Sequence, residues 1–352
     1  MPMESHVRRL HVSKAKIAVL LFGVFLLVLM AKGIIYSGRV MQSTGITPTT
    51  LFRLVFDSGA DLRPIEGRVN ILLLGIPGGT HEGTDLTDTI LVLSFHEKNH
   101  TLSMISLPRD IWSDTLKDKV NSAYHYGELK SRETGSRSAG KKGGLILSKA
   151  IVSDMVGLPI QYALVLDFSG FRKVIDLVGG VEVNVPKSFT DSEFPVPGKE
   201  NDTCGGDLEV RCRYQPLHFE AGIQRMDGET ALQYVRSRHA EGEEGSDFAR
   251  GRRQQEVLLA LKARLMSKDI YLNPGELEKL YGAFDEATDM DMNIGELVTV
   301  GKLFMGIPKE QTQRISLEDK LYTPPSSWYG RYVLLPQESF EAIHTFVKSS
   351  LK

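Results

Sequence analysis

The sequence predicts an α/β fold, with helices in α/β/α layers around a mixed central sheet, and three observations support this class. Short apolar runs alternate with longer segments of helical periodicity along the chain. Glycine-rich turns separate many of them. The short link Glu97–His100 joins two apolar runs as a hairpin would, so at least one strand pair is antiparallel. Strands mixed with helices at these spacings indicate a single domain.

The first expected strand is Val69–Gly75, a continuous apolar run that ends in glycine, as buried strands do. Two more strands are expected at Thr89–Phe95 and Thr101–Leu107, on either side of the hairpin link. We interpret Lys187–Glu220, which carries proline and glycine, as an excursion from the core. The other expected elements are helices at 119–127, 144–156, 168–177, 228–234, 250–266, 274–288 and 294–305, and strands at 162–167, 181–185, around 315 and at 332–335.

The N-terminal part of the chain predicts a membrane anchor. Ile17–Tyr36 is an apolar run of roughly membrane-spanning length, and four basic residues precede it. Their charge places the N-terminus in the cytoplasm. A cleaved signal peptide is the alternative, but the run exceeds the usual ~7–15 residues. We therefore expect a cytoplasmic tail at 1–16, a single transmembrane helix at 17–36, a stalk at 37–68 and an extracytoplasmic domain at 69–352, with its motifs in 69–265 and an extension over 266–352.

Net charge and cysteine content narrow the function classes. The formal net charge is −2, so bulk electrostatics give no case for nucleic-acid binding. Cys204 and Cys212 lie close together, and outside the membrane they can persist as a disulfide. A metal site would need more ligands nearby than His218 supplies. A structural disulfide is the better interpretation.

The stretch Val235–Gln255 concentrates arginines. Arg236 and Arg238 are two apart, so in an extended segment they leave the same face. Arg250, Arg253 and Gln254 stand at i, i+3 and i+4 and share a helix face. Arginines that converge at a helix start suit a ligand with several phosphate oxygens. The alternative is that they are solvated or paired with nearby carboxylates, namely Glu241, Glu243, Glu244 and Asp247.

A glycine-rich loop follows the first strand and offers Asp85 and Asp88. Such a loop is a usual ligand site in an α/β sheet, but this one lacks a nucleotide fingerprint. Mg²⁺ takes one or two carboxylates together with phosphate oxygens and water, which these aspartates could supply. Equally, Asp85 could form a turn and Asp88 cap the next strand.

At the end of the third strand, Ser106-Leu-Pro-Arg-Asp110 projects Arg109 and Asp110 where α/β sheets bind ligands. Lys119 and Asn121 follow shortly. The alternative is a surface turn with an ordinary ion pair. Taken together, the carboxylates, Arg109 and the arginine-rich stretch predict a site for a metal-bridged pyrophosphate, which requires charge neutralisation and positioning.

The order of these motifs resembles the LytR–CpsA–Psr (LCP) family. They are NILLLG, LTDT, SLPRD, KVNSAY, FSGF with DLVGGVEVNVP, ALQYVRSRH and SDFARGRRQQ, between Val69 and about Leu265. The resemblance implies a membrane-anchored enzyme that transfers a glycopolymer from a polyprenyl-pyrophosphate carrier onto peptidoglycan. The products are a phosphodiester and polyprenyl phosphate, and Mg²⁺ assists. The implied partners are the lipid-linked glycopolymer, the peptidoglycan acceptor and membrane lipid.

The resemblance also implies roles for particular residues. The implied catalytic residues are Asp88, Arg109, Arg236, Arg238 and Arg250. Pyrophosphate binding is expected of the same four arginines together with Arg253 and Gln254. Asp88 falls on the family's magnesium aspartate, and we expect Asp85 as a second metal ligand. Supporting roles are expected for Asp110, Lys119, Asn121 and Asp247, the last also a candidate base.

Two positions depart from the family pattern. Pro77 stands where the family usually has an aspartate, and Leu86 where an arginine is common. Asp85 is our hypothesis for a replacement carboxylate. If it does not serve, a polyprenyl-phosphate-binding sensor or scaffold without efficient turnover is the alternative function. A simple lipid pyrophosphatase is a third.

Overall fold

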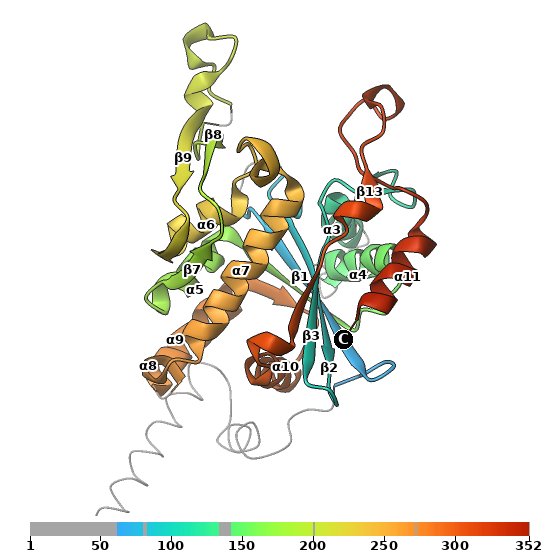
Figure 1. Ribbon diagram of the computed structural model, residues 1–352, viewed down its shortest axis with the longest axis vertical. Helices are drawn as coiled ribbons and strands as arrows, with labels where there is room; N and C mark the ends of the chain where they lie inside the picture. The colour runs from blue at the N-terminus through green and yellow to red at the C-terminus, as the bar shows by residue number, and fades with distance from the viewer. Residues whose placement is uncertain (1–61, 80–82, 134–141, 200, 272, 352) are drawn as a thin grey trace, which may run out of the picture. The chain divides into compact units, whose positions relative to one another are not determined.

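A six-stranded mixed sheet forms the centre of the domain in the computed structural model, which describes residues 62–79, 83–133, 142–199, 201–271 and 273–351 (Figure 1). Its strand order is β11-β6-β1-β2-β3-β12. The strands are β1 (Arg68–Ile76), β2 (Thr89–His96), β3 (Thr101–Ser106), β6 (Tyr162–Asp167), β11 (Thr288–Met290) and β12 (Thr312–Ile315). β1 pairs antiparallel with β2 and parallel with β6. The predicted mixed α/β fold is confirmed.

Alternating side chains give the sheet two buried faces. Leu72 and Leu74 of β1 belong to a cluster with apolar residues of α3 (Ala123–Glu133), α4 (Lys142–Val156) and α11 (Phe340–Ser350). Val69 and Ile71 belong to a second cluster, with residues of α7 (Asp247–Leu265) and α10 (Ile294–Gly306). Figure 1 shows α4 and α11 on one side of the strands and α7 on the other. Each fully buried side chain of this kind contributes roughly 1.5–3 kcal/mol, so both layers are firmly attached.

A third apolar cluster joins the other face of α7 to a small subassembly beside the sheet. It comprises α5 (Phe168–Leu177), α6 (Gly228–Arg236) and a two-stranded sheet of β7 (Val181–Val185) and β10 (Gly222–Met226). Asp167 ends β6 and caps α5 by accepting a hydrogen bond from the Gly170 amide at 2.8 Å. The cap directs the chain from the sheet edge straight into the subassembly. Helices α8 (Lys268–Tyr271) and α9 (Pro274–Ala287) follow α7.

The predicted excursion is an antiparallel hairpin with a covalently closed tip. Strands β8 (Phe189–Pro195) and β9 (Tyr214–Phe219) pair from Phe189 opposite Phe219 outward. Beyond them, Cys204 and Cys212 form a disulfide with a Cα–Cα distance of 5.5 Å. We call residues 189–219 the arm. Figure 1 shows it projecting away from the helices beside it.

The structure moves several predicted boundaries. Leu62 is buried in the core, and Arg68, the first residue of β1, donates to Ser94 Oγ at 2.8 Å, so the domain begins inside the predicted stalk. The helix expected at 119–127 begins later, because Lys119 belongs to a short strand and a 3₁₀ turn precedes α3. Thr288 starts β11 instead of ending α9. The short strands outside the main sheet are β4 (Trp112–Ser113), β5 (Asp118–Lys119), β13 (Leu321–Tyr322) and β14 (Leu335–Pro336), so only the end of the strand expected at 332–335 is present.

The predicted transmembrane helix, Ile17–Tyr36, lies outside the described residues. Within the part of the chain that the structure does describe, no helix combines the length and apolarity needed to cross a membrane.

Candidate functional site

The structure brings most of the predicted site residues into one pocket. Its lining comes from the start of β2, from the segment that follows β3, from α5, α6 and α7, and from the arm. The lining residues are Asp88, Thr89, Arg109, Phe168, Phe194, Pro195, Val235, Arg236, Arg238, Arg250 and Gln254. We call this the arginine pocket. Four arginines and one carboxylate line it, so it is strongly cationic although the chain as a whole is nearly neutral.

Arg109, which follows β3, forms an ion pair with Asp88, which directly precedes β2. Burial acts to lower the pKa of Arg109, but the carboxylates of Asp88, Asp110 and Asp247 together raise it. The guanidinium is therefore permanently charged. Its Nε is buried and, within the described residues, donates no hydrogen bond; it lies 3.5 Å from Asp110 Oδ2. A buried donor of this kind is suited to an incoming phosphate oxygen.

Asp110 and Asp247 form a carboxyl pair behind Arg109. Burial alone would raise the pKa of Asp110, but a hydrogen bond from Lys119, whose Nζ lies 2.5 Å from Oδ1, and the charge of Arg109 lower it. Burial raises the pKa of Asp247, and the nearby Asp110 charge adds to this, against the opposing effect of Arg250. The two groups are hydrogen bonded, so Asp247 holds a proton more readily than an ordinary aspartate.

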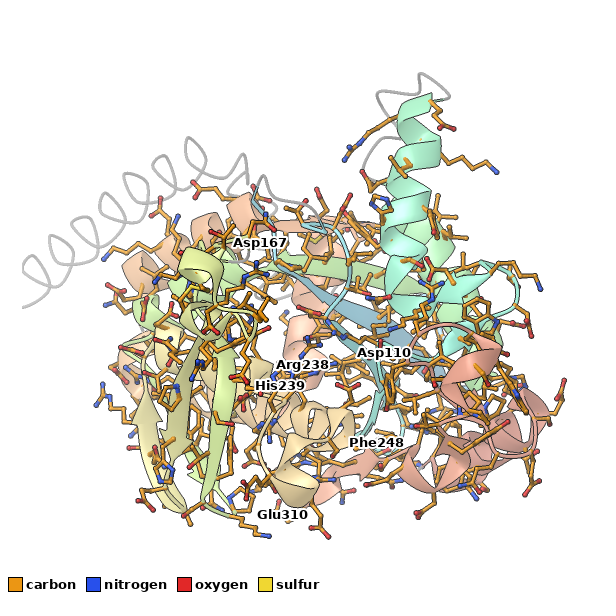
Figure 2. All side chains as sticks on the ribbon, turned by 90° about the horizontal axis from the view of Figure 1, so that it is seen from above. Asp110, Asp167, Arg238, His239, Phe248 and Glu310 are labelled. Carbon is orange, nitrogen blue, oxygen red and sulfur yellow. A yellow bond between two sulfur atoms is a disulfide. The ribbon has the colours of Figure 1, made fainter. Side chains whose placement is uncertain are left out.

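Arg236 and Arg238 enter the pocket from the end of α6. The sequence predicted an extended segment at Arg236, but this residue is the last one of the helix. Its guanidinium carbon lies 4.9 Å from the ring centroid of Phe168 and 5.6 Å from that of Phe194. Cation–π contacts of this type fix the plane of the guanidinium. Figure 2 shows Arg238 near the centre of the view, with His239 beside it and Asp110 toward the sheet.

Arg250 and Gln254 enter the pocket from α7, where their i, i+4 spacing places them on one face. The helix starts at Asp247, three residues before the predicted start, with Ser246 as its N-cap. Arg250 therefore lies inside the helix and is only 5% exposed, paired with Asp247 at 3.0 Å. The start of α7 is buried and cationic, and Arg250 is paired with Asp247, one of the carboxylates named in the alternative interpretation.

Two predicted ligands do not line the pocket. Arg253 turns to the other side of α7, where its Nε donates to the Tyr234 carbonyl at 3.0 Å and Nη1 contacts Glu244 at 2.9 Å. It is 3% exposed and holds the backbone, and burial lowers its pKa. Asp85 lies 3.1 Å from His125 Nδ1 and so faces α3. Asn121 contributes through its backbone, whose carbonyl accepts from the Thr87 amide.

A larger groove of about 540 Å³ lies beyond Arg253 and Tyr234 and also contains arginines. Each of these is already paired with a carboxylate: Arg252 with Glu318, Arg253 with Glu244 and Arg314 with Glu256. Arg109 and Arg250 of the arginine pocket are paired too, but its lining has four arginines and a single carboxylate, whereas two carboxylates line the groove. The arginine pocket is therefore the better anion site.

Asp88 is the carboxylate of the arginine pocket that could hold Mg²⁺. Asp88 lines the pocket, and one carboxylate with phosphate oxygens and water is a normal ligand set for this ion. The structure does not bring Asp85 into the lining as a second ligand. Among described residues, the one group of three or more potential ligands close enough to share an ion is Asp202, Cys204 and Cys212, where both thiols are consumed by the disulfide.

Sequence reasoning missed the apolar wall of the pocket, formed by Phe168, Phe194, Pro195 and Val235. Phe168 could have been found, since it starts a predicted helix at the carboxyl end of a strand. Phe194 carries no such signal, because it lies in the excursion, where the sequence has no clear period. As a whole, the arrangement can hold a polyphosphate against an apolar group.

Comparison with known families agrees with this geometry. The model of the LytR_cpsA_psr family matches residues 57–348. The chain belongs to this family. Within the family, it is 27% identical over 268 residues to polyisoprenyl-teichoic acid–peptidoglycan teichoic acid transferase TagV of Bacillus subtilis (strain 168), covering 74% of this chain and 59% of TagV. TagT of the same strain is 27% identical over 308 residues, 84% of this chain and 79% of TagT.

The first of these relatives is matched only in part, since the chain spans 59% of its length. Solved structures share the fold. The crystal structure of B. subtilis TagV has a TM-score of 0.55 at 24% identity and covers 81% of this chain and 98% of its own. TagT with bound octaprenyl pyrophosphate lipid has a TM-score of 0.51 at 22% identity, covering 83% and 93%. Membership of the family thus extends over nearly the whole described domain.

Proposed function

We propose that this protein is a membrane-anchored phosphotransferase that moves a glycopolymer from a polyprenyl-pyrophosphate carrier onto peptidoglycan. The observation that carries the proposal is the convergence of Arg109, Arg236, Arg238 and Arg250 with Asp88 in one pocket beside an apolar wall. Guanidinium groups bind phosphate oxygens in pairs, and the four together match a pyrophosphate. The names of the relatives support the same chemistry, since they are teichoic acid transferases.

In this reaction, the acceptor hydroxyl oxygen forms a bond to the phosphorus that carries the glycopolymer. The bond to the bridging oxygen breaks, and polyprenyl phosphate leaves with the electron pair. Arg109, Arg236, Arg238 and Arg250 hold the phosphate oxygens and stabilise the charge that develops on the leaving phosphate. We assign the hydroxyl proton to Asp247, whose carboxylate lies 3.0 Å from Arg250 of the arginine pocket.

Mg²⁺ is part of the proposal, with Asp88 as its protein ligand. When bound, it would neutralise phosphate charge. Asp85 remains a candidate only if the loop that carries it turns toward the pocket, away from His125. Asp88→Asn should therefore abolish Mg²⁺-dependent turnover, while Asp85→Asn leaves it largely intact.

The decisive experiment incubates the full-length chain with a polyprenyl-pyrophosphate-linked glycan, Mg²⁺ and a peptidoglycan oligosaccharide. We expect a glycan–peptidoglycan phosphodiester and free polyprenyl phosphate, and loss of both products in Arg109→Ala. Lipid binding without turnover would instead support a sensor or scaffold, the function that Pro77 in place of the usual aspartate favours. Phosphate release without an acceptor would identify a lipid pyrophosphatase.

A further inference from the structure

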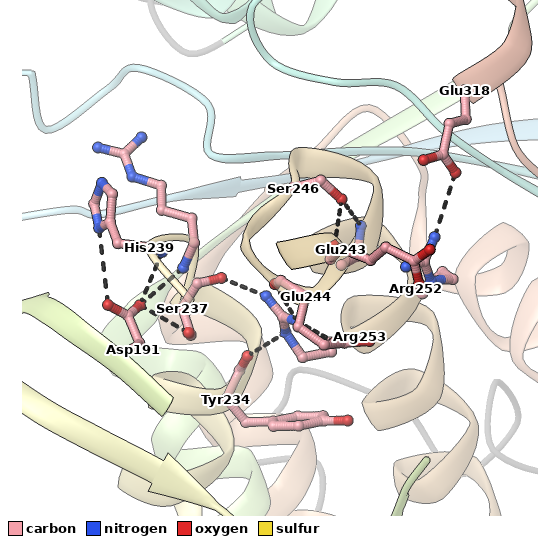
Figure 3. A network of polar contacts seen from close by, with 12 residues as sticks. Asp191, Tyr234, Ser237, His239, Glu243, Glu244, Ser246, Arg252, Arg253 and Glu318 are labelled. Carbon is pink, nitrogen blue, oxygen red and sulfur yellow. Dashed lines mark hydrogen bonds and ion pairs between the residues drawn. The ribbon is translucent and has the colours of Figure 1, made fainter. Parts of the chain in front are cut away.

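The base of the arm is bonded directly to the chain segment that carries two of the pocket arginines. Asp191 of β8 is fully buried, and its Oδ2 accepts three hydrogen bonds from that segment. The donors are Ser237 Oγ at 2.7 Å, the Arg238 amide at 2.9 Å and the His239 amide at 3.2 Å (Figure 3). One carboxylate oxygen therefore fixes the backbone amides of Arg238 and His239 and the side chain of Ser237.

The opposite side of the same segment is held by α7. Arg253 donates to the carbonyls of Tyr234 and Ser237, as Figure 3 shows. The amides of the segment thus face a buried anion and its carbonyls face a buried cation. Buried charges are retained only where hydrogen bonds compensate their desolvation, and here the backbone supplies that compensation.

A β-bulge explains how Asp191 and Phe194 of the arm come to be buried on the same side. Residues three apart on a regular strand face opposite sides. Here the register shifts between Asp191 and Phe194, and both are buried. Bulges re-aim side chains in this way. Phe194 consequently reaches Arg236, while Asp191 reaches the backbone that follows Arg236.

We propose that the arm is part of the pyrophosphate site and that Asp191 is a positioning residue for Arg236 and Arg238. Its three hydrogen bonds set the backbone from which both guanidinium groups enter the arginine pocket. The inference rests on the proposed function, since it assigns pyrophosphate binding to these arginines. It gives the arm a role in ligand binding besides any role of its tip.

A double-mutant cycle on the full-length chain in detergent tests the proposal, with farnesyl pyrophosphate and Mg²⁺ as the probe. Asp191→Ala should weaken binding roughly tenfold, within the usual range for residues that share a hydrogen-bond network. In the Arg236→Ala/Arg238→Ala background it should weaken binding no further. Asp191→Asn, which keeps an acceptor oxygen, should lose less affinity than Asp191→Ala. If Asp191→Ala does not fold, Asp191→Asn is taken through the same cycle.

The matched control is Cys204→Ser/Cys212→Ser, which opens the tip of the arm and leaves Asp191 in place. Its affinity for farnesyl pyrophosphate should stay that of the native chain. The proposal is overturned if Asp191 variants bind as the native chain does, or if they lose the same factor with and without the two arginines. Failure of the native chain itself to bind farnesyl pyrophosphate would refute the proposed function instead.

Discussion

Neighbouring arginines on α7 differ completely in environment. Arg250 is 5% exposed and lines the arginine pocket, whereas Arg252 is exposed and pairs with Glu318. A buried charged hydrogen bond is worth about 1.5–3 kcal/mol, while an exposed ion pair is worth little. The two positions therefore form a matched pair for testing the pocket.

Arg250→Ala should weaken farnesyl pyrophosphate binding by a factor on the order of 10 to 100, because it removes a buried phosphate ligand. Arg252→Ala should leave the affinity unchanged. Isothermal titration calorimetry on both variants gives the comparison. Equal losses would mean that the general charge of α7, and not the pocket, attracts the ligand.

Because the pKa of Asp247 is raised, we expect the stability of the protein to depend on pH. Its pKa is raised by burial and by Asp110, so the stability that it contributes is complete below its unfolded pKa and is lost as pH rises through the folded pKa. The Asp247→Asn variant has no carboxyl group to ionise at this position, so it does not lose this stability as pH rises. Its melting temperature should therefore gain on that of the native chain over the range in which pH rises above about 4, the ordinary pKa of aspartate. A constant difference across that range would contradict the raised pKa.

At the scale of elements, α7 links the pocket to the core. Its N-cap, Ser246, accepts a hydrogen bond from the Ala249 amide at 3.1 Å. The same helix presents Arg250 and Gln254 to the pocket and buries Val257 in the subassembly core. Fraying of its first turn would therefore disturb ligand binding as well as packing.

Ser246→Ala should lower the free energy of unfolding by about 1 kcal/mol, as loss of a serine N-cap does. Ser246→Asp, which also caps well, should stay near the native value. Urea denaturation followed by circular dichroism measures both. A loss of the same size in both variants would show that the hydroxyl acts through another contact, such as its bond to the Glu243 carbonyl.

Elements with a clear period were predictable from sequence, and the pairing of distant segments was not. The strand at 162–167 and the helix at 168–177 have their predicted bounds, because an apolar run and a capping aspartate mark them locally. Arg250 and Arg253 share a helix face by spacing, yet three residues turn a helix by about 300°. The two side chains therefore point about 60° apart around the helix axis. Arg253 donates to the Tyr234 carbonyl, in a segment that only the tertiary fold brings near.

The site was predictable where its motifs border strands, as at Asp88 before β2 and Arg109 after β3. It was not predictable where a loop side chain pairs with a residue that is distant in the sequence. Asp85 pairs with His125, which comes from a helix 40 residues later, and nothing local to Asp85 indicates this. Asp191 was missed because its partners are distant in the sequence. All three groups that donate hydrogen bonds to it lie more than 40 residues away.

At the scale of the whole molecule, burial differs sharply between the sheet and the arm's tip. Leu72 is fully buried in β1, between β2 and β6, whereas Leu208 at the tip is 98% exposed. The same truncation at the two positions thus separates core packing from surface contributions.

Leu72→Ala should cost about 2–5 kcal/mol of unfolding free energy, because it leaves a cavity in the central strand. Leu208→Ala should change it by less than about 0.5 kcal/mol. Chemical denaturation of the two variants provides the measurement. A large loss at position 208 would mean that the tip packs against another part of the protein.

The closed tip of the arm also has a practical use. The disulfide between Cys204 and Cys212 closes the loop at the tip. A short epitope or a fluorophore placed in this loop, near the exposed Leu208, would therefore be held in a constrained position. Exposed loop tips tolerate such insertions well. The arm residues that line the arginine pocket are Phe194 and Pro195 and not residues of the tip, so a dye at the tip would report the approach of large partners while leaving the chemistry of the pocket untouched.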